Sequence, residues 1–148
     1  LGVERASNLH DAVSSAHIVS IHAPLTPETR HLVDAELFSQ MQDGVLIVNT
    51  ARGGLIDDRA LLAALNSGKV AGAGLDVTEP EPLPSGHPLL DHQRVVVTPH
   101  VASATNEGRK RIFGMALEQI LCALGGIKPS HILNPEVWPG RNSERVDT

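Results

Sequence analysis

The sequence of 148 residues has a formal net charge of −5, and 41% of its residues are hydrophobic. This length allows one domain with a proper core but not two full ones, and the composition is typical of a globular protein. The acidic balance argues against nucleic acid or an acidic membrane surface as the main partner, because both attract basic patches. No apolar run approaches the ~18 residues that span a bilayer, so we expect a soluble chain.

The single cysteine, Cys122, excludes an internal disulfide and fits a reducing compartment. The sequence begins at Leu1, without an initiator methionine and without a signal-peptide pattern. We therefore expect a cytoplasmic protein whose upstream part is missing from this sequence.

Strands alternate with helices along the first half of the chain. β-Branched apolar runs predict the strands, and short polar residues before apolar runs predict the helix starts. Pro24 and Pro27 interrupt regular structure after the first strand. The expected elements are a helix over 9–16 capped by Ser7 or Asn8, a strand over 18–22, a helix over 34–41 capped by Asp34, and a strand over 45–48.

The same alternation continues in the second half. Residues 79–91 hold four prolines and are expected to form an ordered loop. From residue 128 the chain is mostly polar and without periodicity, so it is expected to wrap another surface or to fray. The other expected elements are a helix begun by Asp57 or Asp58 and ended at Gly68, a strand over 70–77, a strand over 95–97, and a helix over 106–124 capped by Thr105.

This alternation predicts an α/β fold with a parallel sheet and helices on both of its faces. Three segments that carry reactive side chains, 49–54, 76–82 and 98–105, each follow a predicted strand. The carboxyl ends of parallel strands meet at one edge of the sheet, where open α/β folds bind ligands. That edge would hold an arginine, a carboxylate and a histidine, a set suited to an anionic carbonyl compound and to proton transfer.

Each of these side chains has a functional and a structural interpretation. Arg52 could bind a substrate carboxylate through its planar fork, or form a surface ion pair. His100 could donate a proton near neutral pH, or be a hydrogen-bonded packing residue. Asp76 could accept a hydrogen bond from a bound ligand, or cap the next turn. We favour the functional interpretation of each. Arg52 stands between Asn-Thr-Ala and Gly53-Gly54, His100 ends a strand after Pro99 in a loop of small residues, and Asp76 lies at the strand edge where ligands gather.

Other chemistries have little support in the sequence. The histidines do not show zinc-ligand spacing, and one cysteine cannot form a thiolate cluster. A Gly-x-Ser-x-Gly nucleophile motif is also absent. We therefore expect no metal, and hydride transfer in which a cofactor supplies the difficult chemistry.

These motifs resemble the D-isomer-specific 2-hydroxyacid dehydrogenases. The resemblance rests on Asn49-Thr50-Ala51-Arg52-Gly53, on Leu75-Asp76-Val77 followed by Glu81, on Pro99-His100, and on the loop from His22 to Thr29. It covers nearly the whole chain, from about Leu9 to Asn134. The sequence of residues 74–90, with Pro-Leu-Pro and His-Pro-Leu-Leu, is most similar to that of the glyoxylate/hydroxypyruvate reductase branch.

The resemblance implies a Rossmann-like dinucleotide-binding domain and a set of site residues. Glu81, rather than Glu79, would pair with the imidazole and fix its tautomer, because the family has a glutamate five residues after the aspartate. The implied cofactor is NAD or NADP, and the implied substrate is a small 2-oxo or 2-hydroxy acid. The implied catalytic residues are Arg52, Glu81 and His100, and the implied cofactor-binding residues are His22, Pro24, Thr29, Thr50, Ala51, Arg52, Asp76, His100 and Ala102.

The chain also departs from the family pattern. It lacks the Gly-x-Gly-x-x-Gly turn that holds the pyrophosphate, and most of the substrate domain. We therefore interpret 1–127 as the C-terminal part of an NAD(P)-binding domain that is incomplete at its N-terminal side, and 128–148 as a tail that returns to the substrate domain. We expect this partial chain to be inactive alone, and the full-length protein to be a homodimer. The alternative is a non-catalytic dinucleotide-binding regulatory module, like the related co-repressors.

Overall fold

The computed structural model describes residues 2–138 and separates the chain into two compact units, Leu1–Ala102 and Ser103–Thr148. The predicted domain boundary lies at residue 127, whereas the two compact units divide at residue 102. The domain boundary stays a prediction. Of the predicted tail 128–148, residues 139–148 lie outside the described residues.

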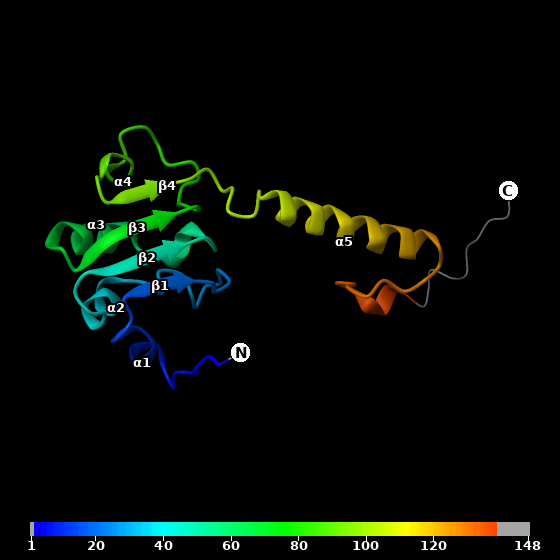
Figure 1. The fold of residues 1–148 in the computed structure, drawn as a ribbon, viewed down its shortest axis with the longest axis horizontal. Coiled ribbons are helices and arrows are strands. Elements are labelled where there is room, and N and C mark those ends of the chain that lie inside the picture. Colours follow the sequence, from blue (N-terminus) through cyan, green and yellow to red (C-terminus); the bar gives the residue numbers. More distant parts are fainter. Residues whose placement is uncertain (1, 139–148) are drawn as a thin grey trace. The chain divides into compact units, whose positions relative to one another are not determined.

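The first unit contains a four-stranded sheet in which all strands are parallel (Figure 1). Strands that are consecutive in the chain are also neighbours in the sheet. The strands are β1 (Ile18–Ile21), β2 (Val45–Asn49), β3 (Val70–Leu75) and β4 (Val95–Val97). The predicted parallel α/β sheet is confirmed. Two strands end earlier than predicted, because His22 and the Asp76–Val77 pair belong to the loops that follow.

The helices of this unit begin and end at the residue types that the sequence indicated. They are α1 (Leu9–Val13), α2 (Ala35–Gln40), the 3-10 turn η1 (Gly53–Leu55), α3 (Asp58–Ser67) and α4 (Pro88–Asp91). Asn8, Asp34 and Asp57 cap α1, α2 and α3 by accepting backbone N–H bonds. Gly68 ends α3 in the left-handed conformation, with φ of 82°.

Two local predictions need correction. The first helix ends at Val13 rather than at residue 16. The predicted loop 79–91 contains the short helix α4, in which His87 is the cap and Pro88 is the first helical residue. Proline is favoured at this position because its missing N–H would have no partner there, so proline content alone did not exclude a helix.

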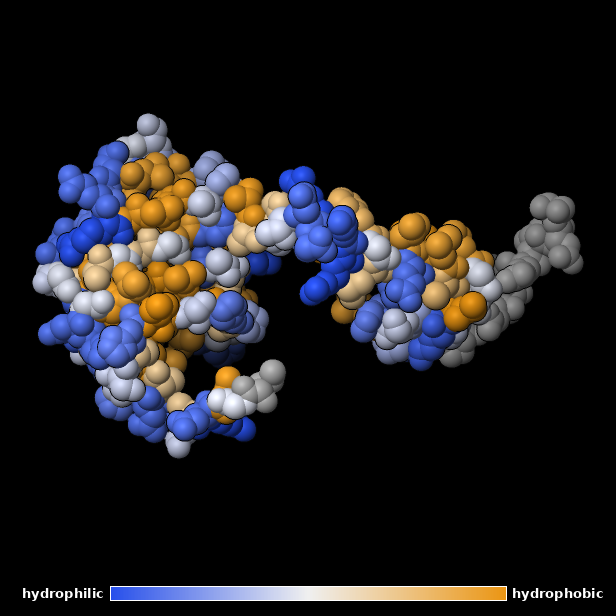
Figure 2. Space-filling model, viewed as in Figure 1, coloured by the Kyte–Doolittle hydropathy of each residue, from blue (hydrophilic) through white to orange (hydrophobic). Residues whose placement is uncertain are grey.

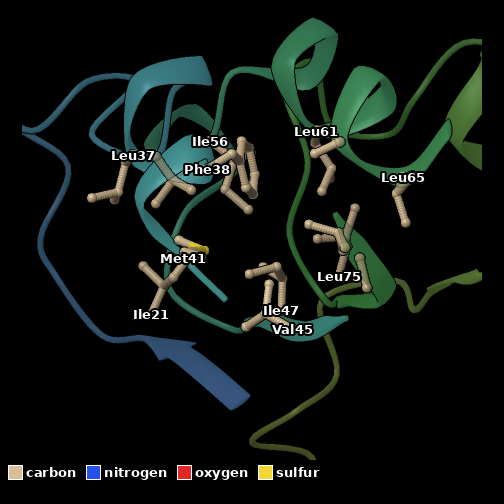
Figure 3. Close-up of a cluster of buried hydrophobic side chains, with 14 of the residues drawn as sticks. Ile21, Leu37, Phe38, Met41, Val45, Ile47, Ile56, Leu61, Leu65 and Leu75 are labelled. Carbon is tan, nitrogen blue, oxygen red and sulfur yellow. The ribbon is translucent and has the colours of Figure 1, made fainter. Parts of the chain in front are cut away.

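The hydrophobic core lies between the sheet and its helices (Figure 3). Alternate strand residues point into it, because side chains of a strand alternate between the two faces. Their helical partners include Leu37, Phe38, Leu61 and Leu65, each at most 7% exposed. The strand residues in the core include Ile21, Val45, Ile47, Ala73 and Leu75.

The opposite face of the sheet is apolar but open. Ile18, Leu46 and Val96 are 61%, 43% and 65% exposed, and a side chain built at Gly74 would meet no atom within 4 Å. The expectation of helices on both faces is therefore wrong for this unit. Each connection leads from one strand to its next neighbour, always in the same direction across the sheet. Right-handed connections of this kind place all their helices on one side of the sheet.

The second unit consists of α5 (Asn106–Leu124), the turn η2 (Pro135–Val137) and their connection. The helix has the predicted bounds, and Thr105 caps it by accepting from the N–H of Gly108. Gln119 holds the following chain through Ser130 Oγ and the N–H of His131. The large apolar residues of α5 are exposed, and apolar surface is visible on each unit (Figure 2). Between residues 2 and 138, no helix is long and apolar enough to cross a membrane.

Candidate active site

The predicted site residues follow three neighbouring strands of the first unit. Arg52 follows β2, Asp76 and Glu81 follow β3, and His100 follows β4. Because these strands are parallel, the loops that carry the residues all leave the carboxyl edge of the sheet, where open α/β folds bind ligands.

The side chains of Glu81 and His100 are in direct contact. Oε1 of Glu81 lies 2.7 Å from Nδ1 of His100, and both side chains are about half exposed. A carboxylate on Nδ1 favours a proton on that nitrogen, which leaves Nε2 for exchange with a ligand. Only tertiary structure could bring together these two residues, which are separated by 19 positions.

The neighbouring acid, Glu79, has a different partner. Both of its carboxylate oxygens accept from the guanidinium of Arg30, at 3.1 and 2.8 Å. The family spacing therefore selected the correct acid, since Glu81 and not Glu79 contacts the imidazole. The bidentate Arg30–Glu79 pair ties the loop after β1 to the loop after β3.

The backbone of His100 is in the left-handed region, with φ of 54°. This conformation costs roughly 1–2 kcal/mol for a residue with a side chain, so the surrounding structure must hold it. The N–H of His100 donates to the carbonyl oxygen of Asp76 at 2.9 Å.

Asp76 is 5% exposed, and its carboxylate accepts three hydrogen bonds from the loop after β4. Oδ1 accepts from the hydroxyl of Thr98 at 2.5 Å and from the N–H of Val101 at 2.8 Å, and Oδ2 accepts from the N–H of Ala102 at 2.8 Å. The Thr98 hydroxyl, aided by the two amides, lowers the pKa of Asp76 against the opposing effect of burial. The carboxylate of Asp76 thus binds the loop after β4 rather than the turn that follows Asp76 itself, and one of its donors is the amide of Ala102, a predicted cofactor residue.

Arg52 is presented by a turn that Asn49 organises. Asn49 is 1% exposed; its side-chain amide donates to the carbonyl of Arg52 at 2.8 Å and accepts from the N–H of Ala51 at 3.0 Å. The guanidinium of Arg52 is exposed and donates to the carbonyl of Ala51. Within residues 2–138, no hydrogen bond or ion pair joins Arg52 to the Glu81–His100 pair.

Arg52 lines a cavity of about 580 Å³ at the ends of β1 and β2. The other lining residues are His22, Ala23, Pro24, Leu25 and Ala51. The predicted cofactor residues His22, Pro24 and Ala51 are thus brought together with Arg52. Thr50 is exposed in the same turn, whereas the hydroxyl of Thr29 donates to the carbonyl of Pro24 at 2.6 Å and closes the loop after β1.

Gly53 sets the spacing between two of the loops. A Cβ atom built there would lie 2.1 Å from the carbonyl carbon of Thr78, so the two backbones touch. Residue-by-residue interpretation missed the roles of Gly53, Asn49 and Thr98. The asparagine at the end of a predicted strand and the glycine after Arg52 were visible signals in the sequence. The partners of Asn49 are local, whereas those of Gly53 and Thr98 lie in distant parts of the chain.

Residues 1–102 match the family described as D-isomer specific 2-hydroxyacid dehydrogenase, NAD binding domain. The match includes every residue of the site described above. The chain belongs to this family.

Similar dehydrogenases are longer than this chain. A glyoxylate reductase from Thermofilum pendens is 44% identical over 140 residues, which cover 95% of this chain and 41% of that protein. A glyoxylate/hydroxypyruvate reductase B from Escherichia fergusonii is 40% identical over 133 residues, 90% of this chain and 41% of that protein. The chain thus spans about two fifths of these relatives, in their C-terminal part.

A solved family member has a similar fold. The D-isomer specific 2-hydroxyacid dehydrogenase from Xanthobacter autotrophicus, in complex with NADPH and MES, is 39% identical with a TM-score of 0.72. The superposition covers 88% of this chain and 53% of that one. Within the 2-hydroxyacid dehydrogenase family, this chain therefore has the common fold of the NAD-binding domain.

The residues at the carboxyl edge fit a nicotinamide group. The 580 Å³ cavity is lined by the small side chains Ala23 and Ala51, which leave room for a flat ring beside Arg52. Among the described residues, no group of three or more His, Cys, Asp or Glu side chains could hold a metal ion.

Proposed function

We propose that this chain supplies the acid–base pair and the nicotinamide side of an NAD(P)-dependent 2-hydroxyacid dehydrogenase. The reaction interconverts a small 2-oxo acid and the 2-hydroxy acid, and glyoxylate or hydroxypyruvate is the proposed substrate. The observation that carries the proposal is the 2.7 Å contact between Glu81 and His100 at the same sheet edge as Arg52. Family membership and the names of the similar reductases support it.

In this proposal His100 is the proton donor for reduction and the acceptor for oxidation. Glu81 holds Nδ1, so Nε2 gives its proton to the oxygen of the former carbonyl group. In this role the carboxylate also faces the ring when it carries the proton, because Oε1 of Glu81 lies 2.7 Å from Nδ1.

Arg52 is the proposed clamp for the substrate carboxylate. Its planar guanidinium can donate two parallel hydrogen bonds to one carboxylate, which fixes the orientation of the neighbouring carbonyl. Asn49 holds the turn that carries the guanidinium by two hydrogen bonds, to the carbonyl of Arg52 and from the N–H of Ala51.

NAD or NADP is the proposed cofactor, and it supplies or takes up the hydride when bound. His22, Pro24 and Ala51 would contact its nicotinamide end, since they line one cavity with Arg52. Thr29, Thr50, Asp76 and Ala102 remain predicted cofactor residues on the resemblance alone. The homodimer and the cytoplasmic location also remain predictions.

The test uses the isolated chain and a fusion. In the fusion, the part of the Thermofilum pendens glyoxylate reductase that precedes the aligned region is joined to residues 1–148. We expect no NADH- or NADPH-dependent reduction of glyoxylate by the isolated chain, and turnover by the fusion. His100→Ala in the fusion should reduce kcat about 100-fold or more, while reduced cofactor still binds.

Three outcomes would count against the proposal. Turnover that is unchanged in the His100→Ala fusion would exclude this histidine as proton donor. Cofactor binding by a folded fusion without any turnover would favour the regulatory module instead. Turnover by the isolated chain would contradict the need for a phosphate-binding turn and a substrate domain.

A further inference from the structure

Asp76 contacts nearly every residue of the loop that carries His100. Its carbonyl oxygen accepts from the N–H of His100, and its carboxylate accepts from the Thr98 hydroxyl and from the N–H groups of Val101 and Ala102. The remaining residue of the loop, Pro99, has no N–H to donate. One residue therefore binds both sides of His100.

Packing does not hold this loop within the first unit. His100 and Ala102 are exposed, and Val101 is 45% exposed. His100 also has a positive φ, a conformation that a non-glycine residue keeps only when neighbours enforce it. Hydrogen bonds therefore maintain the loop: four go to Asp76, one joins the N–H of Thr98 to the carbonyl of Leu75, and one joins the imidazole to Glu81.

We propose that Asp76 is a positioning residue for proton transfer: it holds the backbone of the His100 loop so that the imidazole stays against Glu81. Two acids then share the task, since Glu81 binds the ring at 2.7 Å and Asp76 binds the main chain on either side. This inference rests on the proposed function, in which His100 exchanges the proton.

The positioning role is separate from the cofactor contact that the resemblance implies for Asp76. An ionised carboxylate has about four acceptor positions, and protein donors use three of them, which leaves one for a ligand. A direct contact with the cofactor makes cofactor affinity change when the carboxylate is removed. The positioning role makes proton transfer change even where the carboxylate is kept and only its donor on the loop is lost.

The first experiment uses the 148-residue chain itself and needs no turnover. NMR measures amide hydrogen exchange at Val101 and Ala102, and the imidazole nitrogen signals of His100, in the Thr98→Val and Thr98→Ser variants. Valine nearly matches threonine in shape but removes the hydroxyl, whereas serine keeps it. We expect faster exchange and altered ring signals for valine, near-native values for serine, and unchanged exchange in β2 for both.

The second experiment measures kinetics in the fusion described above, with Asp76→Asn and Thr98→Val. We expect kcat to fall about tenfold or more in both variants, with the Kd for NADH changed less than about threefold in Thr98→Val, which keeps the carboxylate. If Asp76→Asn does not fold, Thr98→Val alone decides, because it leaves the carboxylate in place.

The outcomes separate the two proposals. A large loss of NADH affinity with kcat retained would overturn the positioning role and favour the cofactor role. Native kcat in Thr98→Val, together with native amide exchange, would also overturn it, provided that His100→Ala is inactive in the same fusion. If His100→Ala is itself fully active, the proposed function fails, and the positioning role fails with it.

Discussion

Glu81 and His100 form a carboxylate–imidazole pair across 19 positions of sequence, whereas Glu79, two residues before Glu81, binds Arg30. The two acids have similar exposure, 42% for Glu81 and 41% for Glu79, so their partners and not their burial distinguish them. This difference makes them a matched pair for mutagenesis.

Glu81→Gln in the fusion should reduce kcat about tenfold or more, because a neutral amide cannot stabilise the imidazolium. Glu79→Gln should change kcat less than about threefold, since the exposed pair that it disrupts is worth roughly 1 kcal/mol or less. Steady-state kinetics at saturating cofactor measure both. Equal losses in the two variants would argue that neither acid assists His100 specifically.

Arg52→Lys should reduce kcat/KM for glyoxylate about tenfold or more, because an ammonium group cannot reproduce the planar fork on a carboxylate. Arg59→Lys is the control, since Arg59 lies on α3 and outside the cavity that Arg52 lines. Kinetics with glyoxylate as the varied substrate test this prediction, and equal values for wild type and Arg52→Lys would exclude the clamp.

Gly53→Ala should destabilise the isolated chain by about 1–3 kcal/mol, because its Cβ would overlap the backbone of Thr78 and push two loops apart. Gly74→Ala is the matched control: it lies on the open face of β3, where a Cβ meets nothing within 4 Å. We expect the control to be neutral or slightly stabilising. Urea unfolding monitored by circular dichroism compares the two, and similar midpoints would contradict the close loop contact.

Asp57 and Asp58 should affect the pH dependence of stability in opposite directions. Hydrogen bonds from the amides of Ala60 and Arg59 lower the pKa of Asp57, whereas burial raises the pKa of Asp58 despite the nearby His87. Ionised Asp57 therefore stabilises the fold above its ordinary pKa, and this stabilisation is lost as pH falls through the lowered value. Ionisation of Asp58 lowers the stability of the fold. This loss develops as pH rises through the raised pKa of Asp58, and it is absent below the ordinary pKa of an aspartate.

Asn substitutions isolate these charges, since asparagine can still cap a helix. At about pH 7, Asp57→Asn should be less stable than wild type and Asp58→Asn at least as stable. At about pH 3 both differences should shrink. Denaturant midpoints at the two pH values provide the measurement, and a loss of stability at neutral pH in Asp58→Asn would refute the sign given for that residue.

Local signals in the sequence were sufficient for much of the first unit. Asn8, Asp34 and Asp57 cap helices as predicted, and Gly68 ends α3, because caps depend on hydrogen bonds to the next few residues. The parallel direction of the strands also followed from their alternation with helices, whereas their order in the sheet came from the structure. The short helix α4 was not predicted, since the prolines around it obscured its start.

What the sequence by itself determined was the class of fold, the family, and which strand end carries each reactive residue, because these depend on local pattern and motif spacing. What only the tertiary structure decided was the partners: Glu81 on His100, Glu79 on Arg30, and Asp76 on the loop of Thr98–Ala102. These partners are 19 to 49 positions apart. Nothing in a local pattern encodes such contacts, since they exist only once the parallel strands bring their loops to one edge.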